Sequence, residues 1–257
     1  MSAHRHLLKW YAELEGMDLS LSEQPLNRFD ENLGMEQTTM QRGGVIDKMM
    51  QAEAAVEESS NSRSIADACN TLSELEAAIR AFNGCSIKKG ALNTVFADGN
   101  PNANLMLIGE APGAIEDEQG IPFCGPSGQL LNNILVSIAL KREELYITNT
   151  TFWRPPGNRR PTSEEIQICK PFVEKHVALV APKLIILVGN TAVESLLGLH
   201  LPMHAIRDRS FDYLNCYMKH PIKTVVIFHP SYLLRQATKK KEMWFDMLKI
   251  KNTYLSS

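Results

Sequence analysis

Four short runs of apolar residues, separated by helical patterns, constrain the fold of this chain more than any other feature of its sequence. The runs lie at residues 105–108, 145–149, 184–188 and 224–228. They are apolar almost throughout instead of alternating with polar residues, which is typical of strands buried on both faces. Strands that alternate with helices form parallel sheets. We therefore predict an α/β fold, with a doubly wound four-stranded parallel sheet and helices on both faces.

The helices are indicated by apolar residues three and four positions apart, the spacing of a helix that packs one face against a core. It predicts helices over residues 64–82, 130–138, 163–180, 191–198 and 231–252. Ser163 is the expected N-cap of the third of these helices. Each predicted strand is therefore followed or preceded by a helix that can cover the sheet.

Residues 1–63 lack this regular pattern and are predicted to be an N-terminal extension, with the domain itself at 64–257. Residues 5–16 have the spacing of an amphipathic helix. Residues 18–63 lose all periodicity, so we expect mainly linker there, with a short helix near 46–57.

The charge is distributed unevenly along the chain. Residues 1–84 carry a net charge of −7, and residues 85–257 carry one of +5. The mildly basic part permits a polyanionic partner, and the acidic extension permits a protein partner.

Several classes of protein are excluded by what the sequence lacks. No apolar run approaches the ~18 residues of a membrane span, so no membrane partner is expected. The N-terminus has no continuous apolar core and no small-residue cleavage site, so we expect no secretory signal. The five cysteines are scattered and odd in number, which favours a reducing, cytoplasmic location over a disulfide framework. We expect a cytoplasmic monomer.

Residues that can carry chemistry follow each predicted strand. These are the turn Gly-Glu-Ala-Pro-Gly at 109–113, Asn149, the pair Gly189-Asn190, and His229. Each is ordinary by itself, as a turn, a cap or a structural histidine. Ligands of parallel sheets bind at the carboxyl ends of the strands, so their convergence at one edge predicts a binding site. A nucleotide-binding protein of another kind would need a phosphate fingerprint such as GxGxxG or GxxxxGK[ST], and neither is present.

Three segments carry a family resemblance: GEAPGAIEDEQGIPFCGPSGQLL, YITNTTFWRPPGNRRPTSEEI and IFHPSYLLR. Together they resemble the uracil-DNA glycosylase superfamily, and most of all its iron–sulfur type, family 4. The resemblance runs from about Phe82 to about Ile250. It implies a DNA-repair hydrolase that flips uracil out of DNA, hydrolyses its N-glycosidic bond and leaves an abasic site for base excision repair.

The resemblance also implies the residues that surround the base. Phe123 matches the phenylalanine that stacks on uracil, and Gly109 and Ala111 belong to the first substrate-binding motif. Asn149 matches the asparagine that reads the uracil edge, where an amide can donate to O4 and accept from N3–H. His229 matches the histidine that stabilises negative charge on the leaving uracil, an interaction that acts as the charge develops.

A carboxylate is expected to position the attacking water. Family 1 enzymes have an aspartate at the third position of the first motif, where this chain has Ala111. Glu116 resembles the family 4 glutamate thought to position water, and Glu110 is expected to order the loop. Both are treated as candidate catalytic residues.

The segment after His229 resembles the part of the family that enters the DNA helix. Leu233 and Leu234 resemble its apolar wedge, and Ser231 and Arg235 are expected to contact phosphates. The three lysines at 239–241 add non-specific attraction to the DNA backbone, although a solvated helix face explains them equally well.

The sequence departs from family 4 at the ligands of its 4Fe–4S cluster. Cys85 and Cys169 match two of the four cysteines, whereas Lys88 and Trp153 stand at the other two positions. Such a cluster requires four thiolates. We therefore expect that the cluster is lost, that the protein has no cofactor, and that Trp153 packs where the cluster would lie.

One alternative on the same fold is a protein that binds uracil or abasic sites without turnover. A related subgroup crosslinks to abasic DNA through a histidine in the loop after the second strand. Residues 154–162 contain no histidine, which argues against that version.

Overall fold

The computed structural model describes residues 55–255, all within one compact unit, Met49–Ser257. The predicted helix at 5–16 and the linker up to residue 54 lie outside the described residues. Residues 55–68 are helical, so the last part of the expected linker is a helix. Position 63, the end of the predicted extension, lies inside it; the division into extension and domain stays a prediction. Within the described residues, no helix combines the length and apolarity needed to cross a membrane.

A six-stranded sheet forms the centre of the fold, in the order β1-β3-β2-β4-β6-β5. Its strands are β1 (Asp98–Gly99), β2 (Leu105–Gly109), β3 (Tyr146–Asn149), β4 (Leu184–Val188), β5 (Ser210–Tyr213) and β6 (Ile222–Ile227). The four predicted strands are present and mutually parallel. The predicted number of strands was too low, because β1 and β5 add antiparallel edges. β1 is two residues long and β5 is largely exposed, so neither forms an apolar run.

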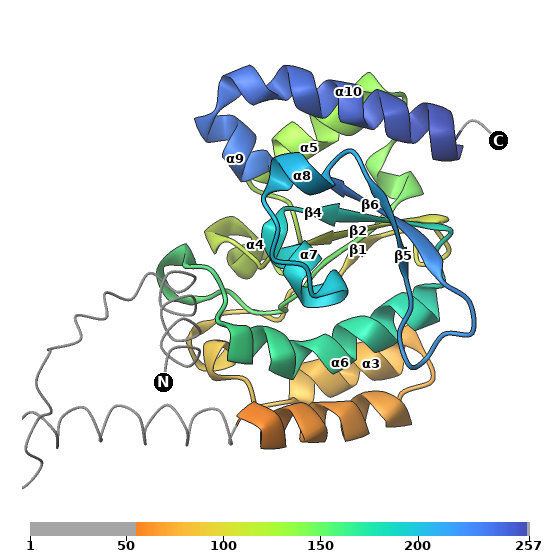
Figure 1. The fold of residues 1–257 in the computed structure, drawn as a ribbon. Coiled ribbons are helices and arrows are strands. Elements are labelled where there is room, and N and C mark those ends of the chain that lie inside the picture. The colour runs from red at the N-terminus through yellow and green to blue at the C-terminus, as the bar shows by residue number, and fades with distance from the viewer. Residues whose placement is uncertain (1–54, 256–257) are drawn as a thin grey trace, which may run out of the picture. The chain divides into compact units, whose positions relative to one another are not determined.

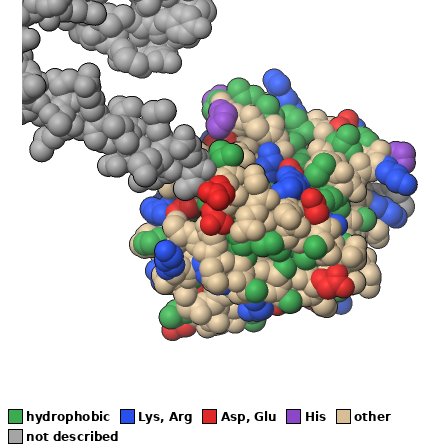
Figure 2. Space-filling model, turned by 90° about the horizontal axis from the view of Figure 1, so that it is seen from below, with side chains coloured by type: hydrophobic (Ala, Val, Ile, Leu, Met, Phe, Trp, Pro, Cys, Tyr) green, Lys and Arg blue, Asp and Glu red, His purple; other side chains and the backbone are tan. Residues whose placement is uncertain are grey.

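Helices cover both faces of the sheet (Figure 1). One face packs against α3 (Leu72–Ala81), α6 (Ser163–Val180) and α7 (Asn190–Leu197), and the other against α5 (Pro126–Ser137), α9 (Pro230–Arg235) and α10 (Lys240–Ile250). Alternate residues of β2 serve the two cores: Met106 and Ile108 lie in the first, Leu105 and Leu107 in the second. Two short helices, α4 (Ala114–Gln119) and α8 (Met203–Ile206), lie in connections. Over α3 and α6, the surface seen from below intersperses side chains of both charges (Figure 2).

Two of the helices that spacing alone predicts to be continuous are each divided in the structure. The predicted helix 64–82 is two helices, because Thr71 Oγ1 accepts the Glu74 amide at 3.2 Å and Glu74 Oε2 accepts the Asn70 amide at 2.7 Å, which starts α3 anew. The predicted helix 231–252 is α9, a 3₁₀ turn at Ala237–Lys239, and α10. The break lies at Gln236, whose φ of −126° and ψ of 74° are not helical.

The N-cap of α6 is Thr162, one residue earlier than predicted. Its hydroxyl accepts the Glu165 amide at 3.3 Å, and the Glu165 carboxylate accepts the Thr162 amide at 2.8 Å. This reciprocal capping box satisfies two donors of the first turn. Ser163 is therefore the first residue of the helix.

The register of the parallel strands brings their carboxyl ends to one edge. Gly109 at the end of β2 pairs with Asn149 at the end of β3, and Val188 of β4 pairs with Ile227 of β6. The chain leaves the sheet just after these pairs, so the polar residues that follow the strands are neighbours, as predicted.

Candidate active site

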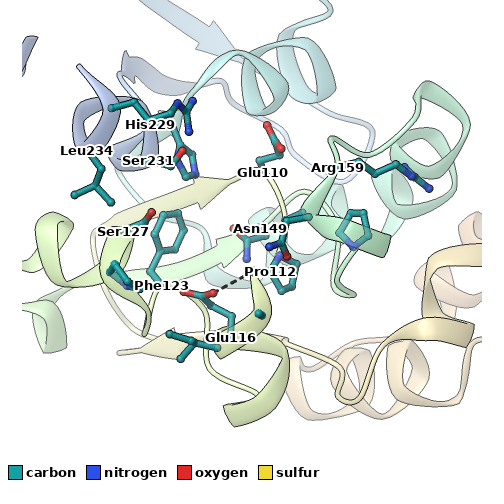
Figure 3. Close-up of a pocket in the computed structure, with 18 residues that line it drawn as sticks. Glu110, Pro112, Glu116, Phe123, Ser127, Asn149, Arg159, His229, Ser231 and Leu234 are labelled. Atoms are coloured by element: carbon teal, nitrogen blue, oxygen red, sulfur yellow. Dashed lines mark hydrogen bonds between the residues drawn. The ribbon is translucent and has the colours of Figure 1, made fainter. Parts of the chain in front are cut away.

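A cavity of about 490 Å³ lies at the carboxyl edge of the sheet (Figure 3). Its walls come from the turn after β2, the end of β3, the loop between α4 and α5, and His229 with α9. All the predicted base-contacting residues except Gly109 line it directly: Ala111, Phe123, Asn149 and His229. The sheet thus brings together residues that are 118 positions apart in the sequence, from Ala111 to His229.

Gly109 lies beneath this group and allows it to assemble. A Cβ atom at Gly109 would lie 2.4 Å from Phe123 Cζ and 2.5 Å from Asn149 Oδ1. Neither side chain could keep its position against such an atom. Glycine at the end of β2 therefore lets an aromatic ring and a carboxamide meet at the floor of the cavity.

Phe123 is held by its backbone, in a conformation unusual for a bulky residue. Its φ is 51°, in the left-handed region. The Arg142 guanidinium donates to Phe123 O at 3.1 Å and to Pro122 O at 2.6 Å, and its Nε pairs with Asp98 at 2.6 Å. A Cβ at Gly128 would lie 1.7 Å from Phe123 O. Sequence reasoning missed Arg142, because KREE before β3 has the composition of a solvated turn.

Asn149 is 2% exposed and ends β3 with its amide toward the cavity (Figure 3). The neighbouring Thr150 ties this strand end to the first motif: its amide donates to Gly109 O at 2.9 Å and its hydroxyl to Glu110 O at 2.6 Å. These bonds hold the strand end in place, and the Asn149 amide and the Phe123 ring both lie against Gly109, where the amide can read the edge of a stacked planar ligand.

His229 is the N-cap of α9, and its hydrogen bonds determine its tautomer. Nδ1 accepts the Ser231 amide at 3.2 Å, and Ser231 Oγ lies 2.8 Å from the same nitrogen. A nitrogen that accepts an N–H carries no proton, so the proton of the neutral ring is on Nε2. Burial, with a smaller contribution from Arg235, lowers the pKa of His229 to about 4. His229 is therefore a neutral donor at neutral pH, with its ring 5.8 Å from that of Phe123.

The hydrogen bonds of the two candidate carboxylates differ from the expected division of roles. Glu116 Oε2 accepts the amide of Gly113, the N-cap of its own helix α4, at 3.1 Å, and Oε1 accepts the Gly125 amide at 2.8 Å, which joins α4 to the loop before α5. Glu110 Oε2 accepts the Thr191 hydroxyl at 2.6 Å, at the start of α7. Glu116 thus orders the loop, and Glu110 is fixed at the cavity wall through one oxygen.

The two predicted wedge leucines have different surroundings. Leu234 is 48% exposed and lines the mouth of the cavity with Arg235 and Ser231. Leu233 is 0% exposed and packs in the core with α5 and α10, so its prediction as a wedge was wrong. On a helix, consecutive residues point in different directions, and only one of the pair can face outward here.

A wall that sequence reasoning assigned no role is formed by Pro155, Asn158 and Arg159. The Arg159 guanidinium is bound to the buried Glu165 carboxylate by contacts of 2.8 and 2.6 Å. The only available sequence signal was the cluster of arginines around RPPGNRRP.

The residues at the positions of the family cluster do not offer the donor set of an iron–sulfur centre. Cys85 and Cys169 are fully buried, and a hydrogen bond to Cys85 together with burial raises the pKa of the Cys169 thiol well above its usual value. Such a cluster requires four thiolates, whereas Lys88 and Trp153 stand at two of the four positions. Within residues 55–255, no group of three or more His, Cys, Asp or Glu side chains is placed to hold a metal.

Lys88 and Trp153 instead contact each other in this region and hold α3 against the loop after β3; we call this pair the staple. Lys88 Nζ donates to Phe82 O at 2.8 Å and to Arg80 O at 2.5 Å, which caps the carboxyl end of α3, and lies 5.7 Å from the Trp153 ring centre. Trp153 is 1% exposed, stacks on Phe82 with ring centres 6.4 Å apart, and donates to Thr94 Oγ1 at 3.0 Å. The indole therefore fills space between α3 and the loop after β3.

The fold and cavity define an α/β protein with a candidate binding site at the carboxyl ends of its strands. Residues 96–249 match the model of the uracil DNA glycosylase superfamily, and the chain belongs to this superfamily.

Curated relatives agree with this membership. The type-4 uracil-DNA glycosylase of Archaeoglobus fulgidus is 32% identical over 184 residues, which cover 70% of this chain and 92% of the relative. That of Thermotoga maritima is 34% identical over 158 residues, covering 61% and 80%. A type-5 uracil-DNA glycosylase of Thermus thermophilus is 32% identical over 127 residues, covering 42% and 58%.

Proposed function

We propose that this protein is a monofunctional uracil-DNA glycosylase that hydrolyses the bond between uracil N1 and deoxyribose C1′ in DNA and leaves an abasic site. One observation carries the proposal: Phe123, Asn149 and a neutral His229 surround a single cavity above Gly109. This set offers a stacking face, an edge reader and a hydrogen-bond donor. Because a base inside a duplex cannot reach such a pocket, the nucleotide must be flipped out.

Each residue acts at a different point of the reaction. Phe123 stacks on the extruded uracil while the Asn149 amide donates to O4 and accepts from N3–H. As the C1′–N1 bond breaks, its electrons pass to the uracil ring, and His229 Nε2–H donates to O2 where negative charge develops. Water adds to C1′ and releases its proton to solvent, and uracil leaves as an anion that takes up a proton once in solution.

The hydrogen bonds favour Glu110 over Glu116 as the group that orients the water. Both Glu116 carboxylate oxygens already accept backbone amides, whereas among the described residues one hydrogen bond, from the Thr191 hydroxyl, holds the Glu110 carboxylate. Outside the cavity, Leu234 takes the place of the departed base, and Arg235 and Ser231 contact the flanking phosphates. The Ser231 hydroxyl also keeps His229 in its donor tautomer.

The proposal extends to the setting of the reaction. The enzyme acts in base excision repair, as a cytoplasmic monomer, and without an iron–sulfur cluster. The acidic extension at 1–63 is a candidate arm for a protein partner.

The test is incubation with an oligonucleotide that contains one uracil, followed by alkali, which cleaves abasic sites. We expect strand cleavage at the uracil and none in a matched thymine oligonucleotide. Specific binding of the uracil strand without cleavage would instead support the non-catalytic alternative. Absence of both would refute the proposal.

A further inference from the structure

Helix α10 presents two aromatic side chains to solvent. Trp244 is 43% exposed and Phe245 is 52% exposed, with ring centres 5.4 Å apart. Within residues 55–255, no other tryptophan or phenylalanine side chain is exposed to this extent. The opposite side of the helix is anchored, because Met243 and Met247 are fully buried against the sheet. The two rings therefore project from a fixed support.

The same side of α10 is positively charged. Lys240 and Lys241 are exposed and precede the two aromatic residues by one helical turn, the spacing at which side chains are neighbours. Lys241 Nζ lies 6.0 Å from the centre of the Phe245 ring. We call Lys240, Lys241, Trp244 and Phe245 the α10 ridge.

The two carboxylates of α10 do not offset this charge. Asp246 is buried and paired with Arg207 at 2.6 Å. Glu242 pairs with both Lys239 and Arg207. Lys240 and Lys241 form no ion pair with any described residue. The ridge thus combines unpaired cations with exposed aromatic faces.

The ridge follows the mouth of the proposed active site along the chain. Leu234 and Arg235 line the cavity at α9, and a 3₁₀ turn at Ala237–Lys239 leads directly into α10. Figure 1 shows α10 starting beside α9 and running on over the sheet. At 1.5 Å per helical residue, Trp244 lies about 6 Å along the helix from Lys240.

We propose that the α10 ridge binds unpaired DNA next to the flipped nucleotide, with bases stacked on Trp244 and Phe245 and phosphates against Lys240 and Lys241. This inference rests on the proposed function in taking DNA as the substrate. Aromatic stacking combined with a cationic track is the means by which proteins hold single strands. A duplex keeps its bases stacked on each other, so the ridge favours a single-stranded flank over a paired one.

A second copy of the chain fits the ridge poorly. Two aromatic side chains cover much less than the roughly 800 Å² that each partner of a stable interface buries. A two-fold contact through the same patch would also place the lysines of one copy against those of the other, and such juxtaposed like charges are unfavourable. A polyanion with flat bases matches both the charge and the rings.

The first test measures equilibrium binding of the full chain to uracil-free DNA, as a single strand of thymidines and as a duplex of equal length. Each stacked base contributes about 5-fold to 150-fold to affinity. We therefore expect Trp244→Ala with Phe245→Ala to weaken single-strand binding by at least about tenfold and duplex binding much less. Leu214→Ala is the matched control. Leu214 is 56% exposed in the loop between β5 and β6, at the amino end of β6 and away from the carboxyl edge that holds the cavity.

Two further measurements separate stacking from charge. Lys240→Glu with Lys241→Glu should reduce the salt dependence of single-strand binding by about 1.4 in logarithmic slope, the amount for two phosphate contacts. Trp244→Phe should retain most of the affinity but lose the quenching of tryptophan fluorescence by the strand. Circular dichroism checks that each variant folds.

Unchanged single-strand affinity in the aromatic double variant would overturn the inference, as would equal losses for single strand and duplex. If the unaltered protein were a dimer and the aromatic double variant a monomer, the ridge would instead be a contact between copies of the chain. Because these strands contain no uracil, the outcome is independent of turnover. Ridge-dependent binding without uracil release would uphold the ridge and refute the proposed function.

Discussion

His229 is kept as a neutral donor by the helix that it caps. Its Nδ1 accepts the Ser231 amide, so the ring proton is on Nε2, and the residue lines the cavity. The proposed bond acts on charge that develops only in the transition state, and loss of one such donor typically costs about 10²–10³ in rate. We expect His229→Ala to lower turnover by that factor while DNA binding changes little.

The measurement is single-turnover cleavage beside equilibrium binding of the same oligonucleotide. His200→Ala is the control, because the side chain of His200 is 79% exposed. Equal losses of binding and rate would give His229 a structural or phosphate-contact role instead.

Asn149 is expected to determine the choice between uracil and cytosine. Cytosine presents a donor where uracil has O4 and an acceptor where uracil has N3–H, so a fixed amide meets like groups at both points. Each buried unpaired group costs ~1–3 kcal/mol, which amounts to roughly 10²–10⁴ in discrimination. Asn149→Asp replaces the amide donor by an acceptor, so most uracil activity should be lost and weak cytosine activity gained.

Matched uracil and cytosine oligonucleotides in single-turnover assays test this, with Asn102→Asp on the exposed turn before β2 as the control. Wild-type uracil activity in Asn149→Asp would mean that another residue reads the base edge.

We expect substitutions of Glu110 and Glu116 to have opposite effects on stability and rate. In Glu116→Gln only the amide oxygen can still accept, so one of the two backbone N–H groups loses its partner and the melting temperature should fall. Glu110→Gln keeps its size and can still accept from Thr191, so it should lower the rate with the melting temperature nearly unchanged. Comparing both variants by thermal unfolding and single-turnover cleavage tests this; the reverse pattern would return the water-positioning role to Glu116.

At the scale of elements, the sequence was sufficient to predict the strands that a continuous run of buried apolar residues defines. β2, β3, β4 and β6 follow continuous apolar runs, and their parallel order brings the motif residues together. The edge strand β5 and the break between α9 and α10 depend on backbone pairing and on one non-helical residue, which leave no periodic signal. For the same reason, the spacing of one continuous helix over 231–252 did not show that Leu233 is buried and Leu234 exposed.

The staple of Lys88 and Trp153 belongs to this scale, because it joins α3 to the loop after β3. That loop continues into Pro155 and Arg159 of the cavity wall. We expect the purified protein to contain no iron–sulfur cluster, and hence no broad absorption near ~400 nm.

Lys88→Cys with Trp153→Cys would add two cysteines to Cys85 and Cys169 and so complete a set of four. This variant should bind iron and gain the absorption band, whereas neither single substitution should. About four irons per chain in the unaltered protein would contradict the expectation.

For the whole molecule, two buried histidines make stability depend on pH. Burial lowers the pKa of His176 to about 3 and, with Arg235, that of His229 to about 4. His176 lies flat on Phe96 with ring centres 4.4 Å apart, and its Nε2 lies 2.8 Å from the Tyr146 hydroxyl. His176 lies within the core beneath α6 and His229 lines the cavity, so the two protonations act at separate places.

The sign follows from proton uptake. Unfolded histidine binds a proton near pH 6.5, whereas the folded rings stay neutral down to about pH 4, so the unfolded state takes up more protons between these values. The free energy of unfolding should therefore fall as pH decreases below about 6.5, by up to about 1.4 kcal/mol per pH unit for each histidine. Urea unfolding between pH 7 and 5 isolates this effect, because most carboxylates are still ionised there. His176→Gln should remove about half of the slope, and an unchanged slope would show that His176 is already charged or exposed in the folded protein.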